Sequence, residues 1–270
     1  MRIALLTLEA QANARAVRRF LAAHADEIVL VGLSDPYRAQ AGGALGQTWR
    51  HLRRSGLRIL PYLALNFALP GLVATLRRTG PEDIDRTPLA RACRARAIAA
   101  VPVRDVNGEA FRDALAASGA DLIVSFHFDQ ILTAETIAAA PLGGMNVHAG
   151  LLPLHRGPVP TIHALLDDPV RLGVSIHRLV PQIDAGSLLA QAEIADEPGL
   201  TALGAAARLH EAALPLLDRV LGEIAAGTAT ETALPVLPYR GFPSAAEMAA
   251  LRRRGRRAAG IADLLALWSG

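Results

Sequence analysis

The N-terminal part of the chain alternates between apolar runs and amphipathic segments. Residues 2–8 form an apolar run typical of a buried strand, and residues 12–23 place apolar side chains among arginines with helical spacing. A second apolar run at 27–33 completes a strand–helix–strand unit of ordinary length. This order predicts a parallel, Rossmann-like sheet. Residues 7–13 contain no glycine, so the dinucleotide-binding fingerprint is missing and NAD is not expected.

The alternation continues to about residue 254. Patterning predicts helices at 87–96, 108–117, 133–140, 202–225 and 245–254. It predicts strands at 97–103, 121–126, 143–148, 174–179 and 187–193. We therefore expect an α/β protein with a mostly parallel sheet, helices on both faces, an inserted helical segment and a short C-terminal appendage. Residues 1–225 are expected to form the main domain, and 226–270 an extended segment with a basic helix.

Residues 42–80 look like an insertion into this pattern. A helix is expected at 46–54, and residues 59–76 form an uncharged run of 18 residues between arginines. The run approaches the lower length limit of a membrane span, but Pro61, Asn66, Pro70 and Gly71 disfavour one continuous helix. Two short helices that cover the core, or an interfacial hairpin beside anionic lipid, are the remaining interpretations.

Composition narrows the chemistry. The 270 residues suit one large domain, and the net charge of +3 gives no reason to expect a nucleic-acid partner. There is no lysine, which excludes lysine Schiff-base chemistry, and Cys93 is the only cysteine. The eight histidines show no familiar metal-ligand spacing, so no metal is expected. Residues 1–6 lack the apolar core of a signal peptide, which favours a cytoplasmic location, with peripheral membrane contact through 59–76 as the variant.

Three polar residues stand out around the strand at 143–148. Asn146 and His148 lie two positions apart, so an extended chain places them on the same side. Asp184 follows in a loop bounded by proline and glycine. An amide, an imidazole and a carboxylate at adjacent strand ends can stabilise an oxyanion, move a proton and orient the imidazole. The carboxylate is expected to raise the pKa of His148.

These residues resemble the signature of the formyltransferases that use 10-formyltetrahydrofolate. That signature reads Asn-x-His-x-Ser-Leu-Leu-Pro-x-x-Arg-Gly, followed some three dozen residues later by Asp-x-Gly. The matching positions here are Asn146, His148, Leu151, Leu152, Pro153, Arg156, Gly157, Asp184 and Gly186. The usual serine is replaced by Gly150. The resemblance covers roughly residues 95–200 and is specific there. It implies catalytic roles for Asn146, His148 and Asp184.

The resemblance also implies where ligands bind. Ligands of open parallel sheets lie beyond the carboxyl ends of the strands, and the family holds the folate with the loop after such a strand. The positions expected to contact folate are Phe126, His127, Phe128, Asp129, Gln130, Ile131, Leu132 and Ile183. The positions expected near the acceptor are Leu152, Pro153, Arg156 and Gly157. Arg156 serves equally well as a loop tether. His155, His163 and His177 are interpreted as structural or solvent-facing, and Asn107 as part of a turn.

The implied activity is formyl transfer from 10-formyltetrahydrofolate to a primary amine. Methionyl-tRNA formyltransferases, whose catalytic domain is similar, carry a further C-terminal barrel of roughly a hundred residues. Only 45 residues follow position 225 here, which argues against tRNA. The stretch 173–191 looks most like amino-sugar formyltransferases, so a nucleotide-linked amino sugar is the expected acceptor. A 10-formyltetrahydrofolate hydrolase, a lipid-linked amine as acceptor and a non-catalytic folate-binding module stay open, as does a homodimer.

Overall fold

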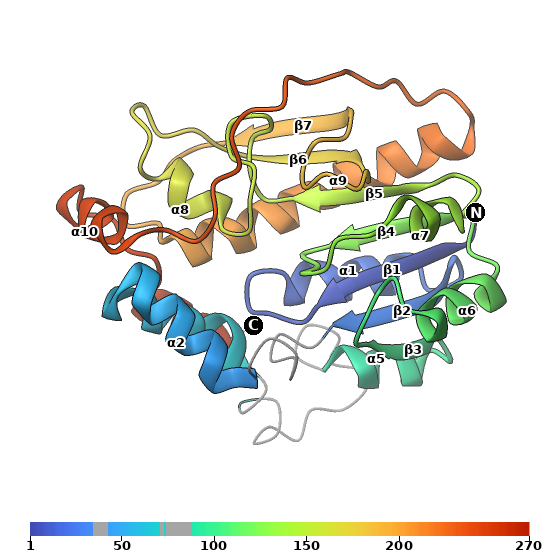
Figure 1. The fold of residues 1–270 in the computed structure, drawn as a ribbon, viewed down its shortest axis with the longest axis horizontal. Helices are drawn as coiled ribbons and strands as arrows, with labels where there is room; N and C mark the ends of the chain where they lie inside the picture. Colours follow the sequence, from blue (N-terminus) through green and yellow to red (C-terminus); the bar gives the residue numbers. More distant parts are fainter. Residues whose placement is uncertain (35–42, 71–72, 74–87, 270) are drawn as a thin grey trace.

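The computed structural model describes residues 1–34, 43–70, 73 and 88–269. Within them the chain forms a seven-stranded sheet in the order β3-β2-β1-β4-β5-β6-β7 (Figure 1). The strands are β1 (Ile3–Leu8), β2 (Ile28–Ser34), β3 (Ala99–Val103), β4 (Leu122–Phe126), β5 (Gly144–His148), β6 (Leu172–Arg178) and β7 (Leu188–Ile194). Neighbours from β3 to β5 pair in parallel, and β6 pairs antiparallel with β5 and β7. The predicted fold class is confirmed.

Helices cover both faces of this sheet because the strands are apolar on both sides. On one face Ile3 and Leu5 pack with α1 (Ala14–Ala23), α5 (Leu89–Ala95) and α9 (Ala202–Ala225). These helices occupy the far face in the view of Figure 1. On the other face Ala4 and Leu6 pack with α6 (Glu109–Ser118), and α7 (Ala134–Ala138) follows β4 on the same side. Successive side chains along each strand point to opposite faces of the sheet, so each strand packs against the helices on both faces.

Helix boundaries follow from their caps. Helix α9 spans the predicted residues, and the Thr201 hydroxyl accepts a hydrogen bond from the Gly204 N–H at 2.9 Å at its start. Ser244 caps α10 (Ala245–Arg253), where Glu247 completes a reciprocal capping box. Thr87, expected at the start of α5, lies outside the described residues. Side-chain caps therefore mark the starts of α9 and α10.

The insertion begins with helical segments that cover the core. They are α2 (Gly43–Ser55), η2 (Leu57–Ile59), α3 (Leu60–Leu63) and η3 (Ala64–Ala68). The side chains of Ile59, Tyr62 and Leu65 are buried in a second apolar cluster, together with Met248 and Leu251 of α10. This agrees with the core-covering interpretation of the run 59–76, of which 71–72 and 74–76 lie outside the described residues. No helix in the described part of the chain is long and apolar enough to cross a membrane.

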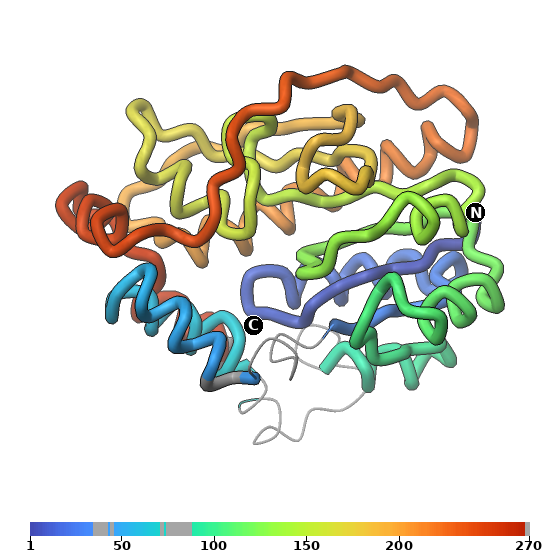
Figure 2. Tube along the Cα trace, in the orientation of Figure 1, coloured from blue at the N-terminus to red at the C-terminus, as the bar shows by residue number. Residues whose placement is uncertain are grey.

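The chain after α9 returns across the sheet toward the insertion (Figure 2). Thr232 forms an isolated antiparallel bridge with Leu188 of β7, and the Arg240 N–H donates to the Arg156 carbonyl at 2.9 Å. Helix α10 then packs against α2 and η2, and α11 (Ile261–Ser269) ends the chain beside α9. The extended segment therefore brings residues near position 240 to the carboxyl ends of β4 and β5.

Candidate active site

Three adjacent strands place polar side chains in one row. Ser125 of β4 is in register with Asn146 of β5, which is in register with His177 of β6. His148 lies two residues after Asn146, so both point to the same side of β5. Met145 and Val147, which alternate with them along β5, face the α9 side and belong to the core. Strand alternation thus directs the amide and the imidazole away from the core and into one cavity.

Asn146 is oriented by His177. The Asn146 Nδ2 lies 3.1 Å from His177 Nε2, and His177 Nδ1 lies 2.9 Å from the Arg178 carbonyl oxygen. The carbonyl can only accept, so His177 donates through Nδ1–H and its Nε2 accepts from the amide. One Asn146 N–H then remains for a ligand. His177 is 2% exposed and lines the cavity, which corrects its interpretation as a merely structural or solvent-facing residue.

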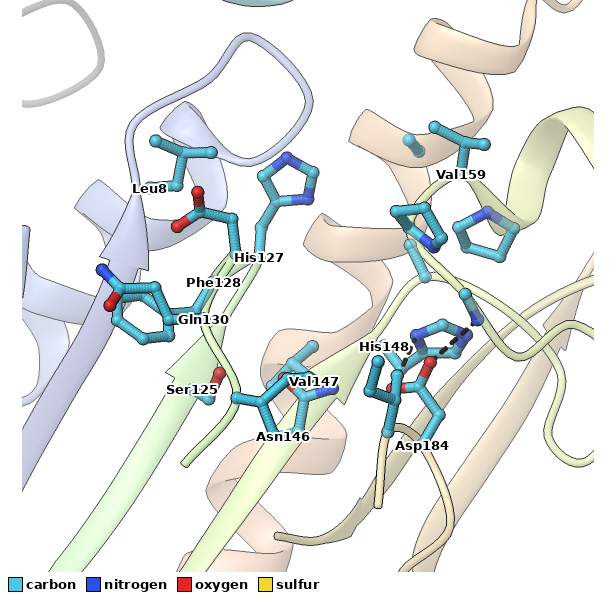
Figure 3. Close-up of a pocket in the computed structure, with 18 of the residues that line it drawn as sticks. Leu8, Ser125, His127, Phe128, Gln130, Asn146, Val147, His148, Val159 and Asp184 are labelled. Atoms are coloured by element: carbon cyan, nitrogen blue, oxygen red, sulfur yellow. Dashed lines mark hydrogen bonds and ion pairs between the residues drawn. The ribbon is translucent and has the colours of Figure 1, made fainter. Parts of the chain in front are cut away.

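His148 has one nitrogen held by the backbone and one beside a carboxylate. Its Nε2 donates to the His155 carbonyl at 2.8 Å, while its Nδ1 lies 3.6 Å from Asp184 Oδ1. The first bond fixes the proton of the neutral ring on Nε2, so Nδ1 carries the lone pair. The His155 ring contacts Asp167 at 2.6 Å, which anchors the residue that supplies this carbonyl. Figure 3 shows His148 and Asp184 facing each other beside Asn146.

Burial sets the protonation state of this pair. Burial lowers the pKa of His148 below its usual 6.5, and the attraction of Asp184, which raises it, is too weak to reverse this. The expected upward shift of the His148 pKa is therefore wrong, because the imidazole is only 6% exposed. Burial also raises the pKa of Asp184, but at low pH the protonated His148, the nearby His177 ring and the Gly157 N–H stabilise the carboxylate more and hold this pKa at about 2. Near pH 7 the pair is a neutral imidazole beside a carboxylate.

Asp184 is held in place by the loop that carries Arg156 and Gly157. Its Oδ2 accepts the Gly157 N–H at 2.9 Å. The Arg156 Nε donates to the carbonyls of Ile183 and Asp184 at 3.2 and 3.1 Å, and its Nη1 donates to the Leu237 carbonyl. Arg156 is 5% exposed and does not line the cavity, so in the structure it tethers the loop.

Gly150 leaves the space that the His148 ring occupies. A Cβ at position 150 would lie 2.8 Å from His148 Nε2 and 2.6 Å from the Cβ of Pro160. Both distances are shorter than real Cβ contacts, so any side chain here must move the ring or the backbone. The position where the family usually has serine therefore controls how His148 is oriented in this chain.

We expect Gly150→Ser to lower kcat by roughly tenfold or more, because a displaced imidazole loses its bond to the His155 carbonyl and its alignment with Asp184. Steady-state kinetics should show a larger change in kcat than in the KM for folate. Gly222→Ser in α9 is the matched control, since nothing lies within 4 Å of a Cβ there. Unchanged kcat in Gly150→Ser would show that the ring tolerates a side chain at this position.

The cavity has a volume of about 280 Å³ and joins the catalytic row to the loop after β4. Of the positions expected to contact folate, those that line it are His127, Phe128, Asp129, Gln130, Ile131, Leu132 and Ile183. Phe126 is completely buried and belongs to the core. Of the positions expected near the acceptor, Gly157 lines the cavity, whereas Leu152, Pro153 and Arg156 do not. The structure therefore does not bring Phe126, Leu152 and Pro153 to the cavity wall.

The loop after β4 is fastened by side chains on both sides. The Gln130 amide donates to the Val103 carbonyl at 3.0 Å and accepts the Val106 N–H at 2.9 Å. Asn107 donates to the Ile131 carbonyl at 2.8 Å and accepts from the Thr133 N–H at 2.8 Å. Asn107 therefore does more than form a turn, since it fixes this cavity wall. These four hydrogen bonds therefore hold the loop in place beside the cavity.

Several cavity residues come from parts of the sequence that carry no motif. Tyr62 and Phe67 come from the insertion, His210 from α9, and Tyr239 and Phe242 from the extended segment. His210 donates through Nδ1 to the Ala12 carbonyl at 2.8 Å, and burial lowers its pKa to about 3. For these residues the sequence offers one local signal, the aromatic side chains of Tyr239 and Phe242 beside Pro238 and Pro243. Across the described ranges, no group of three or more His, Cys, Asp and Glu side chains is arranged to hold a metal ion.

Comparison with known proteins identifies the class. The model of the formyl transferase family matches residues 86–221, just over half of the chain. Asn146, His148 and Asp184 all lie inside the matched part. The chain belongs to the formyl transferase family, and it is a formyltransferase enzyme.

Three solved structures illustrate the similarity of the fold. A sugar N-formyltransferase from Shewanella is 18% identical, with coverage of 93% of this chain and 80% of that chain and a TM-score of 0.55. An N-formyltransferase from Helicobacter canadensis, in complex with folinic acid and dTDP-3-aminofucose, is 14% identical, with 89% and 71% coverage and a TM-score of 0.54. Glycinamide ribonucleotide transformylase 1 from Symbiobacterium toebii is 18% identical, with 87% and 94% coverage and a TM-score of 0.56.

Proposed function

We propose that this enzyme transfers the formyl group of 10-formyltetrahydrofolate to a primary amine on a nucleotide-linked amino sugar. The observation that carries the proposal is the meeting of Asn146, His148 and Asp184 at one cavity, with a free N–H on the amide and a lone pair on the imidazole. The Helicobacter canadensis relative, crystallised with folinic acid and an amino-sugar nucleotide, supports both the co-substrate and the acceptor class. The pterin ring of the folate lies against the loop 127–132.

The reaction needs one oxyanion site and one proton acceptor. The amine nitrogen attacks the formyl carbon, and the carbonyl oxygen becomes an oxyanion in the tetrahedral intermediate. The free N–H of Asn146 donates to this oxygen, an interaction worth about 3–4 kcal/mol in comparable sites. His148 Nδ1 takes the proton that the attacking nitrogen loses. Collapse of the intermediate breaks the bond to folate N10, which leaves as an amine after receiving a proton from His148.

Asp184 and His177 position these groups. The Asp184 carboxylate lies beside Nδ1 and stabilises the imidazolium that forms when His148 takes the proton. It also lies 3.6 Å from His177 Nε2. His177 holds the Asn146 amide so that its nitrogen, and not its oxygen, faces the oxyanion. Each polar group around the reacting carbon therefore has one defined donor or acceptor role.

The pH profile tests the role of His148. The neutral imidazole accepts the proton, and burial lowers its pKa below 6.5, so turnover should stay level near pH 7 and fall with a midpoint below 6.5. Asp184→Asn removes the charge that raises this pKa and should move the midpoint further down. The amine of the acceptor titrates identically with both enzymes, so the comparison isolates His148. The same midpoint in the wild type and in Asp184→Asn would contradict the role of His148 as the proton acceptor.

Turnover by the purified protein tests the function itself. Release of tetrahydrofolate from 10-formyltetrahydrofolate would be followed with and without a panel of nucleotide-linked amino sugars, beside His148→Ala. Glycinamide ribonucleotide belongs in the panel because one relative of the same fold acts on it. Release that depends on an amino-sugar nucleotide and on His148 is the expected result. Release of formate without any amine would establish a hydrolase instead. Turnover only with glycinamide ribonucleotide would show that this compound, and not an amino-sugar nucleotide, is the acceptor.

A further inference from the structure

A second cavity adjoins the catalytic one on the side of the insertion. It has a volume of about 170 Å³, beside about 280 Å³ for the catalytic cavity. The two cavities share the wall residues Leu8, Phe67, Asp129 and Phe242. A ligand that extends past these residues from the catalytic cavity therefore enters the smaller one. We call the smaller space the side cavity.

Helix α2 supplies a polar edge to the side cavity. His51 lies four positions after Gln47 and three after Thr48, so the three side chains share one face of the helix. All three line the side cavity. Among the described residues, no hydrogen bond engages the Gln47 amide, the Thr48 hydroxyl or the ring nitrogens of His51. These donors and acceptors are therefore available to a ligand.

Aromatic rings form another part of this wall. Phe67 of η3 and Phe242 of the extended segment both line the side cavity, and the centroids of the His51 and Phe242 rings lie 4.0 Å apart. Burial lowers the pKa of His51, and the charges of Arg50 and Arg54 lower it further, so this ring is neutral near pH 7. Aromatic faces beside a few uncharged polar groups suit a planar heterocycle with a hydrogen-bonding edge.

The position of the side cavity favours the acceptor over the folate. The folate is expected against the loop after β4 and Ile183, and Ile183 does not line the side cavity. The side cavity instead includes Leu8 at the carboxyl end of β1, which lies across the catalytic cavity from Asp184 (Figure 3). No described residue in its wall is an arginine, and Asp129 contributes a carboxylate. The carboxylates of a folate glutamate tail would be repelled there.

We propose that the side cavity binds the nucleobase of the acceptor, an inference that rests on the proposed transfer to a nucleotide-linked amino sugar. The base stacks on Phe67 and Phe242, as bases do on aromatic side chains elsewhere. An amide and a neutral imidazole each offer a donor and an acceptor, so Gln47 and His51 match the mixed donors and acceptors of a base edge. Residues 47–51 lie outside the family match at 86–221, so this subsite is a feature of the insertion.

Calorimetric titration of the full chain with UDP, dTDP, CDP and GDP tests the proposal directly. At least one of them should bind to the wild type. Gln47→Met and His51→Phe keep the approximate size of each side chain and remove its hydrogen-bonding groups, and each should weaken binding roughly fivefold. His24→Phe is the matched control, since His24 lines neither cavity and should leave the affinity unchanged.

Steady-state kinetics separates the base from the rest of the acceptor. The wild type should prefer a nucleotide-linked amino sugar to the 1-phosphate of the same amino sugar. Gln47→Met with His51→Phe should raise the KM for the nucleotide-linked substrate roughly 25-fold and leave the KM for the sugar phosphate unchanged. The kcat and the KM for 10-formyltetrahydrofolate should also be unchanged.

Three results would overturn the subsite. They are the absence of binding of any nucleoside diphosphate to the wild type, equal nucleotide affinity in the wild type and both variants, and an increase confined to the KM for folate. The last would place the p-aminobenzoyl group of the folate in the side cavity. A wild type that binds a nucleotide through Gln47 and His51 but shows no amine-dependent turnover would refute the proposed function and leave the subsite intact.

Discussion

Replacing His148 with alanine is expected to lower kcat by about a thousandfold, within the range known for a general base. In the proposed mechanism His148 Nδ1 takes the proton of the reacting amine, since its Nε2 is committed to the His155 carbonyl. Asn146→Ala should lower kcat by about 10²- to 10³-fold, through loss of the oxyanion contact. The double variant should be only slightly worse than His148→Ala, because the two residues act on the same intermediate.

The measurement is single-turnover release of tetrahydrofolate at saturating co-substrate. Folate binding should be retained in both variants, because the loop 127–132 is fastened independently through Asn107 and Gln130. His24→Ala is a suitable control. His24 bonds to Glu27 and Asp218, and none of these three residues lines the cavity. A His148→Ala enzyme within tenfold of the wild type would remove this residue from the chemistry.

Local patterns in the sequence accounted for the elements and for the side of β5 that carries Asn146 and His148. Period-2 alternation requires that these side chains share a face once residues 144–148 form a strand. Helix α9 was predicted from residue 202 to 225 from its apolar spacing, and the structure has the same bounds with Thr201 as the cap at its start. Such features depend on neighbours a few positions away, so the sequence contains them directly.

The remaining features of the site depend on contacts between distant residues. His177 lies beside Asn146 because β6 pairs antiparallel with β5, and alternation within β6 does not specify that neighbour. Arg156 is a tether because the carbonyls of Ile183, Asp184 and Leu237 surround it, and nothing near position 156 indicates this. Burial of His148 outweighs the nearby charge of Asp184 in setting its pKa, and burial is a property of the folded structure.

Asp184→Asn is expected to reduce kcat by about 10²-fold or more while the fold is kept. Residue 184 has a φ of 46°, a conformation that asparagine tolerates, and the amide oxygen can still accept the Gly157 N–H. What disappears is the negative charge 3.6 Å from His148 Nδ1, which stabilises the imidazolium. Asp113→Asn on the exposed side of α6 is the matched control for loss of one carboxylate.

The same variant has a consequence for stability because the pKa of Asp184 is held at about 2, below the 3.8 of a free side chain. A depressed pKa stabilises the folded state above the unfolded value and loses that contribution as the pH falls through the folded one. The wild type should therefore have a larger free energy of unfolding than Asp184→Asn between about pH 4 and the pKa of His148, where the carboxylate faces an imidazolium. That difference should shrink below pH 4 and vanish near pH 2. Urea unfolding at a series of pH values measures it, and a constant difference at every pH would mean that the Gly157 contact, and not the charge, stabilises this loop.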